Sequence, residues 1–205
     1  MSTEESLLSY TRSRGTVITS RTSLTHPIHI TEIIHANYPG KIGICICPGK
    51  KSRSTFGWTW NRDLFLDLDR IRDKFGPTTI ITLMPSDELT INKVDMIGEA
   101  IIDRGLEWIH LPIKDMNGPD ISFDNSWIKV VQNIVDRIHQ GEHILVHCKG
   151  GLGRSGTIAA LLLIELGIPN DKAIIQVRIS RPGAIDIADQ EKYILQYSPL
   201  SNPTD

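Results

Sequence analysis

Short apolar runs alternate with amphipathic segments along the middle of the chain, and this pattern predicts strands and helices in turn. Runs rich in β-branched residues predict one or two strands within 16–33 and further strands at 41–47, 78–84, 106–113 and 143–148. Apolar residues spaced three and four apart predict helices at 61–76, 91–105, 123–141, 155–167, 169–180 and 187–197. Such alternation predicts an α/β domain, with a central, mostly parallel sheet flanked by helices on both faces.

The ends of these elements carry their own signals. Asn61 or Thr59 is a candidate N-cap for the first helix, and Asn170 is a candidate N-cap for the helix that follows it. The helix at 155–167 is almost wholly apolar, so we expect it to pack on several sides. Polar ends predict flexible tails at 1–15 and 198–205, which leave 16–197 as one folded domain.

Composition and charge exclude several classes of function. The formal net charge of the 205 residues is −2, so no global basic field suggests a nucleic-acid partner, although a local basic pocket remains compatible. No apolar run approaches the length of a membrane span, and we expect no integral membrane segment. Three cysteines do not form a secreted disulfide framework, and the N-terminus lacks the features of a signal peptide. A cytoplasmic location is therefore expected.

The stretch "HILVHCKGGLGRSGT" at 143–157 carries the strongest chemical signal. Cys148 ends a short apolar strand, and ligands of open α/β sheets bind beyond the carboxyl ends of the strands. Glycines 150, 151 and 153 allow the backbone to curl into a nest of N–H groups in front of a helix N-terminus. This field favours the thiolate of Cys148, and Arg154 adds a planar fork for anionic oxygens. Phosphate is the anion that fits such a nest best.

Phosphoryl transfer follows from these groups. Cys148 is the candidate nucleophile for an in-line attack on phosphorus, and neither a metal nor another cofactor is required because Arg154 and the loop amides neutralise the oxygens. A general acid must protonate the leaving group. Ser155 and Thr157 are candidates to hydrogen-bond the sulfur, and His147 is expected to order the loop.

Other polar and aromatic residues have simpler interpretations. Lys50, Lys51 and Arg53 form a basic stretch that we interpret as a solvated loop, with a substrate-attracting rim as the alternative. Cys45 and Cys47 are expected to be buried in a strand. The tryptophans at 58, 60 and 127 are expected to pack, and the histidines lack the spacing of a metal site.

The segment "HCKGGLGRSG" resembles the signature of cysteine-dependent protein phosphatases: His-Cys, five residues, Arg, Ser or Thr, then Gly. The segment "LPIKDMNGPD" looks like the general-acid loop of that superfamily. "RPGAIDIADQEKYI", "CPGKK" and "RDLFLDLDRIRDKFGPTTIITL" resemble the kinase-associated phosphatase (cyclin-dependent kinase inhibitor-like) branch of dual-specificity phosphatases. The resemblance covers residues 40–197 and implies a protein tyrosine phosphatase-like fold for the catalytic domain.

The resemblance also implies roles for individual residues. Cys148 would be the nucleophile, Arg154 the phosphate clamp and Asp115 the general acid, while Gln190 stands where relatives hold a glutamine near the hydrolytic water. Asp120 competes with Asp115 for the acid role, and Asp115 is favoured because it directly follows a strand. The phosphate-binding loop would comprise Lys149, Gly150, Gly151, Leu152, Gly153 and Arg154.

Substrate choice stays open at this point. The implied partner is a phosphorylated protein, with phosphotyrosine as the first candidate and phosphoserine or phosphothreonine as further ones. No counterpart of the deep phosphotyrosine-recognition loop is evident, so a phosphoinositide phosphatase is an alternative. A phosphoprotein-binding module without turnover and a rhodanese-like or arsenate-reducing enzyme are others, and the intact signature disfavours all but the first of these. The oligomeric state is not predicted.

Overall fold

A computed structural model describes residues 11–13, 16–54 and 57–200 of the chain. Residues 1–10, 14–15 and 201–205, which make up most of the two predicted tails, lie outside the described residues. At the centre is a five-stranded sheet, and in spatial order its strands are β4 (Thr31–Ile34), β5 (Lys41–Ile46), β10 (His143–Cys148), β8 (Pro77–Thr82) and β9 (Glu107–His110).

The strand that ends at Cys148 is the middle strand of this sheet, as the short apolar pattern of 143–148 predicts. It pairs in parallel with β5 on one side and with β8 on the other, and β8 pairs in parallel with β9. The expectation of a mostly parallel sheet needs one correction, because the sheet is mixed. Edge strand β4 runs antiparallel to β5, since the connection at 35–40 is too short for a parallel crossover.

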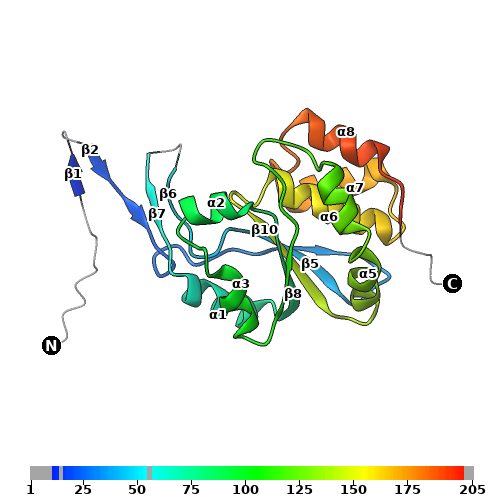
Figure 1. Cartoon of the computed structure of the whole chain (residues 1–205), viewed down its shortest axis with the longest axis horizontal. Coiled ribbons are helices and arrows are strands. Elements are labelled where there is room, and N and C mark those ends of the chain that lie inside the picture. Colours follow the sequence, from blue (N-terminus) through cyan, green and yellow to red (C-terminus); the bar gives the residue numbers. More distant parts are fainter. Residues whose placement is uncertain (1–10, 14–15, 55–56, 201–205) are drawn as a thin grey trace.

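Helices cover both faces of the sheet, so the predicted α/β architecture is confirmed (Figure 1). One face packs against α1 (Leu64–Lys74) and α3 (Ile97–Ile102). The larger core lies on the other face, and its helices are α4 (Ile121–Trp127), α5 (Val131–His139), α6 (Gly153–Glu165), α7 (Asn170–Ser180) and α8 (Ala188–Gln196).

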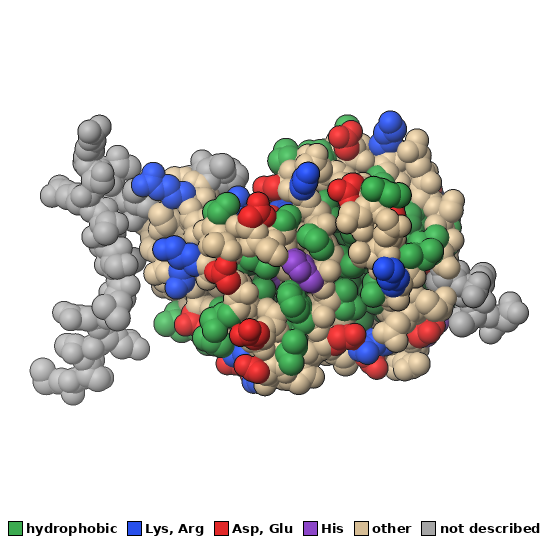
Figure 2. Space-filling model, viewed as in Figure 1, with side chains coloured by type: hydrophobic (Ala, Val, Ile, Leu, Met, Phe, Trp, Pro, Cys, Tyr) green, Lys and Arg blue, Asp and Glu red, His purple; other side chains and the backbone are tan. Residues whose placement is uncertain are grey.

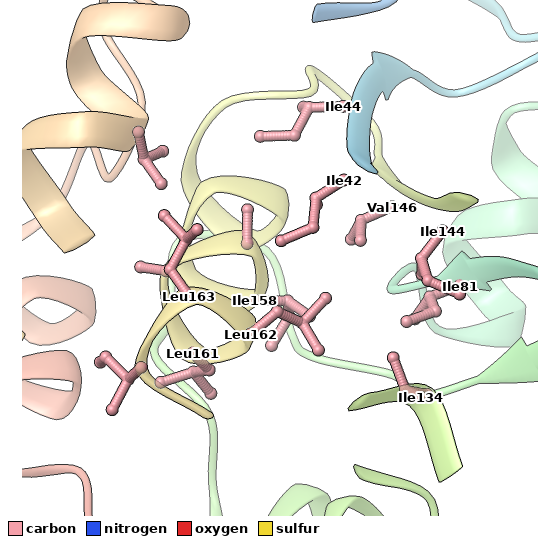
Figure 3. Packing of buried hydrophobic residues seen from close by; sticks show 14 of the residues in the cluster. Ile42, Ile44, Ile81, Ile134, Ile144, Val146, Ile158, Leu161, Leu162 and Leu163 are labelled. Carbon is pink, nitrogen blue, oxygen red and sulfur yellow. The ribbon is translucent and has the colours of Figure 1, made fainter. Parts of the chain in front are cut away.

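The α6 helix is the centre of the larger core. Every residue from Gly153 to Glu165 is buried, as the unbroken apolar pattern predicts. Figure 3 shows side chains of α6 among those of β5 and β10, with Ile134 of α5 nearby. Each buried aliphatic side chain stabilises the fold by roughly 1.5–3 kcal/mol. The helix that follows the Cys148 loop is therefore held rigidly against the central strands.

A smaller sheet lies beyond the carboxyl end of β5. Its strands follow the order β3 (Ser20–Arg21), β7 (Thr59–Asn61) and β6 (Lys51–Arg53), and a separate pair is formed by β1 (Thr11–Ser13) and β2 (Thr16–Ile18). Figure 1 shows these strands at the end of the molecule opposite α7 and α8. In Figure 2, basic and acidic side chains are interspersed over the visible face, which fits the near-neutral net charge.

Two predicted helices are wrong as single elements. The segment 91–105 contains a break, because Lys93 adopts a left-handed φ of 59° between α3 and a short helix that was not predicted, α2 (Ser86–Ile91). The segment 123–141 divides into α4 and α5, where backbone hydrogen bonds tighten to three-residue spacing at Lys129 and Val130.

Two predicted caps are also wrong. The N-cap of α1 is Asp63, whose carboxylate accepts from the N–H of Leu66, rather than Asn61 or Thr59. Asn170 is the first helical residue of α7 instead of its cap, because its side-chain amide donates to backbone carbonyls at the end of α8.

Candidate active site

Cys148 lies at the carboxyl end of β10, and its side chain is almost fully buried. The sulfur accepts a hydrogen bond from the Ser155 hydroxyl at 2.9 Å and another from the N–H of Gly151 at 3.2 Å. Two donors from the following loop and helix stabilise negative charge on Sγ. The prediction that Thr157 also bonds the sulfur is wrong, because its hydroxyl donates to the Gly153 carbonyl, one turn back along α6, at 3.0 Å.

The loop between Cys148 and α6 is folded tightly against β5. Gly151 has a φ of 64°, and a Cβ atom there would lie 2.5 Å from the carbonyl oxygen of Cys45. Only glycine fits this position without displacing the loop. The chain then enters the 13-residue helix α6 at Gly153, so the unpaired N–H groups of a helix N-terminus lie beside the sulfur.

Arg154 is buried at the start of α6 and binds several oxygens. Its guanidinium donates to both carboxylate oxygens of Glu88, at 2.5 Å and 3.0 Å, and to the carbonyl of Ile113 at 3.1 Å. The nitrogen Nη2 also lies 2.9 Å from Oδ1 of Asp115. Burial lowers the pKa of Arg154, but the hydrogen bond to Glu88 and the negative charge of its neighbours outweigh burial and raise it. The side chain is a fixed cation.

Glu88 is a site residue that the sequence reasoning missed. It belongs to α2, which follows β8, and β8 pairs directly with the strand that carries Cys148. Carboxyl ends of parallel strands meet at one edge of a sheet, so an acidic residue just after β8 was a detectable signal. Glu88 holds the guanidinium of Arg154 in a planar, two-bonded geometry.

The two candidate acids occupy different places. Asp115 lies in the loop after Ile113, lines the same pocket as Cys148 and is half exposed. Asp120 is the N-cap of α4, and its Oδ1 accepts from the N–H groups of Ser122 and Phe123 at 3.0 Å and 3.1 Å. Asp120 lines a separate depression, so the structure brings Asp115 and not Asp120 to Cys148.

Two further predicted residues lie close to the loop. Gln190 of α8 is buried and lines the pocket; its amide nitrogen donates to the Asn117 carbonyl at 3.1 Å. Its Oε1 atom has no hydrogen-bond partner among the described residues. His147 is buried, and its Nε2 is 2.8 Å from Oγ1 of Thr82. Burial lowers the pKa of His147 to about 3, so the ring is neutral at ordinary pH and serves to order the loop.

These residues surround a pocket of about 370 Å³. One wall is the signature loop with Arg154, and the other comes from the small sheet and the residue before it. Four cationic side chains and two carboxylates line the pocket, together with two tryptophans: Lys50, Arg53, Lys149, Arg154, Asp115, Asp186, Trp58 and Trp60. Gly150, Leu152 and Gly153 also line it, whereas Gly151 packs behind the loop against β5.

Part of this wall differs from the expectation drawn from sequence. Lys50 is only 5% exposed and is not part of a solvated loop, whereas Lys51 and Arg53 are exposed. Trp58 and Trp60 contribute to the pocket, while Trp127 is a core residue, as predicted. The burial of Lys50 depends on contacts with residues distant in sequence, which no local charge pattern reveals.

The described residues contain no group of three or more His, Cys, Asp or Glu side chains placed to hold a metal ion. Within the same ranges, no helix has both the length and the apolar character needed to cross a membrane. All three cysteines, including Cys45 and Cys47, are free and buried.

Comparison with known proteins places this site in a family. Residues 68–168 match a model for the DSP-PTPase phosphatase of polymorphic toxin systems. The chain is 28% identical to cyclin-dependent kinase inhibitor 3 of Homo sapiens over 176 residues, which cover 83% of this chain and 79% of that protein. It is 32% identical to protein tyrosine phosphatase type IVA 3 of Bos taurus over 127 residues, 62% of this chain and 67% of that protein.

Solved structures agree. Kinase-associated phosphatase, with its catalytic-site cysteine substituted by serine, superposes with a TM-score of 0.71 at 28% identity, over 82% of this chain and 93% of that one. The phosphatase Tk-PTP in its active form shares the fold, with a TM-score of 0.58 at 23% identity over 81% and 94% of the two chains. The chain therefore belongs to the cysteine-dependent tyrosine and dual-specificity phosphatase superfamily, resembles its kinase-associated phosphatase branch, and is a protein phosphatase, a phosphoric monoester hydrolase.

Proposed function

We propose that the chain hydrolyses phosphotyrosine in proteins, with phosphoserine and phosphothreonine as further substrates, through a cysteinyl-phosphate intermediate. The observation that carries this proposal is the meeting of Cys148, Arg154 and Asp115 in one pocket at the carboxyl end of the central strand. The three free, buried cysteines fit a reducing, cytoplasmic setting for this activity.

In the first step, Sγ of Cys148 attacks phosphorus in line with the ester oxygen. The S–P bond forms as the P–O bond breaks, and the carboxylic acid of Asp115 gives its proton to the leaving oxygen. The guanidinium of Arg154 and the N–H groups of the loop hold the three remaining phosphate oxygens, whose charge rises in the transition state.

In the second step, water attacks the phosphorus of the thiophosphate and the S–P bond breaks. The carboxylate of Asp115 takes the proton of this water, and the unpartnered Oε1 of Gln190 accepts a hydrogen bond that orients it. The hydroxyl of Ser155, 2.9 Å from Sγ, stabilises the departing thiolate. Inorganic phosphate then leaves, and the enzyme is ready for another substrate.

The ion pair between Asp115 and Arg154 describes the pocket before substrate arrives. The Asp115 oxygen that lies 2.9 Å from Nη2 occupies a place where a phosphate oxygen would bind the guanidinium. Substrate displaces this carboxylate, because two anions cannot share the same donor. Asp115 is thereby freed to turn toward the ester oxygen and to act as the acid.

The walls of the pocket support the choice of phosphotyrosine. Trp58 and Trp60 offer apolar, aromatic surface to a tyrosine ring, which the shorter side chains of phosphoserine and phosphothreonine would reach less well. Contact with one aromatic ring corresponds to roughly tenfold in kcat/KM. Peptides of identical sequence that differ only in the phosphorylated residue would measure this preference directly.

The test of the acid step compares Asp115→Asn with Asp120→Asn on a series of aryl phosphates. Asp115→Asn is expected to lose about 10²–10⁴-fold in kcat on phenyl phosphate and clearly less on p-nitrophenyl phosphate, whose leaving group needs little protonation. Asp120→Asn, which alters only a helix cap, is expected to keep the leaving-group dependence of the wild type. A steep dependence in Asp120→Asn and none in Asp115→Asn would reverse the two roles.

A further inference from the structure

We propose that Lys50 binds the phosphate group of the substrate, as a second fixed cation supplied from outside the signature loop. This inference rests on the proposed function, because it assigns a further binding residue to the same pocket. The ligand it concerns is a phosphate monoester dianion, and the free inorganic phosphate product shares the same chemistry.

The position of Lys50 is the first argument. The residue stands between β5 and β6, and its backbone carbonyl accepts from the N–H of Arg62 at 3.2 Å. Its side chain is buried and lines the pocket that contains Cys148. The ammonium donates to the carbonyl of Lys149 at 2.9 Å and lies 4.8 Å from the centre of the Trp60 ring. These contacts fix the cation beside the phosphate-binding loop.

The charge balance around Lys50 is the second argument. Among the described residues Lys50 forms no salt bridge, and one carbonyl oxygen is its sole hydrogen-bond acceptor. The neighbouring buried cation, Arg62, is treated differently by the fold. Its guanidinium donates to both oxygens of Asp67 at 2.7 Å, and both side chains are 1% exposed. A buried cation without an anion is costly, so the vacancy beside Lys50 suits an anionic ligand.

The environment of the lysine agrees with this view. Burial lowers the pKa of Lys50, and the thiols of Cys47 and Cys148 are the groups that oppose the shift, while two neighbouring cations reinforce it. No carboxylate contributes to this balance. A phosphate dianion in the pocket would supply the missing negative charge and stabilise the ammonium form.

The charge of the rest of the site explains why a second cation is needed. Arg154 already contacts two carboxylates, those of Glu88 and Asp115, so its positive charge is matched before substrate binds. A dianion that relied on Arg154 alone would enter a region of negative net side-chain charge. Lys149 and Arg53 also line the pocket, but both are more exposed than Lys50 and are screened by water. Lys50 is the cation of this set that is both buried and anchored.

The test is a pair of matched variants, Lys50→Met and Lys51→Met. Methionine keeps much of the length and apolar character of the lysine stem and removes the charge. Loss of a charge-assisted hydrogen bond predicts a roughly 10- to 100-fold increase in the inhibition constant of inorganic phosphate and in KM for p-nitrophenyl phosphate. Lys51, the exposed neighbour at the start of β6, does not line the pocket, so both constants are expected to stay within about twofold of wild type.

Thermal unfolding separates binding from a structural role. Lys50→Met is expected to unfold at the wild-type temperature or above it, because the substitution removes an uncompensated buried charge. A lower unfolding temperature with unchanged phosphate inhibition would mean that Lys50 only supports the fold, and would overturn the proposal. Equal effects of the Lys50 and Lys51 variants would overturn it as well.

A measurement on the wild-type chain covers the case in which Lys50→Met does not fold. Reductive methylation of lysines, with and without saturating inorganic phosphate, is read by peptide mass analysis. Phosphate is expected to protect Lys50 and to leave Lys51 reactive; equal methylation of Lys50 in both samples would contradict the proposal. Failure of the proposed function is a different result, since wild-type enzyme would then lack turnover of p-nitrophenyl phosphate altogether.

Discussion

The two adjacent glycines of the signature loop provide a sharp test of how the loop is built. At Gly151 the backbone has a left-handed φ of 64°, and an added Cβ would lie 2.5 Å from the carbonyl oxygen and 2.6 Å from the carbonyl carbon of Cys45. These atoms belong to the backbone of β5 in the middle of the sheet and cannot move aside. At Gly150 the φ is not left-handed, and no atom lies within 4 Å of the corresponding Cβ position.

The expected cost of Gly151→Ala follows from these two features. A left-handed conformation costs a non-glycine residue about 1–2 kcal/mol, and forcing a methyl group into filled space costs about 1–3 kcal/mol more. The free energy of unfolding is therefore expected to fall by about 2–5 kcal/mol. If the loop shifts to relieve the contact, the hydrogen bond from the Gly151 N–H to the Cys148 sulfur is lost, and kcat/KM falls as well.

Urea unfolding of Gly151→Ala and Gly150→Ala measures this difference, with p-nitrophenyl phosphate hydrolysis as the second readout. Gly150→Ala is expected to have a free energy of unfolding within about 1 kcal/mol of wild type, since its backbone accepts alanine. Equal stability losses in the two variants, or a larger loss in Gly150→Ala, would refute the loop geometry described above.

Two further predictions concern the groups that order the site. Glu88→Gln removes a charge that is paired with the buried guanidinium of Arg154; we expect kcat/KM to fall roughly 10- to 100-fold, and an unchanged inhibition constant for phosphate would contradict this positioning role. The folded state holds His147 neutral, with a pKa of about 3, whereas the unfolded chain binds a proton near pH 6.5, so folding stability attributable to this group is lost as pH falls below that value. Between about pH 7.5 and pH 5 the loss is about 2 kcal/mol, and urea unfolding of His147→Gln is expected to lack it; parallel pH dependence in wild type and variant would contradict the assignment.

Local sequence pattern predicts much of the frame of this protein. The strand at 143–148 and the glycine loop after it are visible because a short apolar run ends at a cysteine and three glycines follow. The burial of α6 is visible because its pattern has no polar face. From these elements alone, Cys148 and Arg154 are expected at the carboxyl edge of a sheet, where the structure has them.

Contacts between distant segments decide what local pattern misses. Lys93 ends α2 in a left-handed conformation, while the buried Asn92 beside it accepts from the N–H of Lys51 in the small sheet. Glu88 finds Arg154 66 positions along the chain, and Lys50 reaches the Lys149 carbonyl 99 positions along it. A periodicity of two or 3.6 residues carries no information about such pairs.

The most direct test of the account is to look for phosphate on the sulfur of Cys148. Wild-type enzyme mixed rapidly with p-nitrophenyl phosphate and quenched in acid is expected to show a burst of nitrophenol equal to the enzyme concentration, with phosphate on the peptide that contains Cys148. The Cys148→Ser variant is expected to show neither burst nor turnover. Phosphate on another residue, or sustained turnover by Cys148→Ser, would contradict a mechanism built on this thiol.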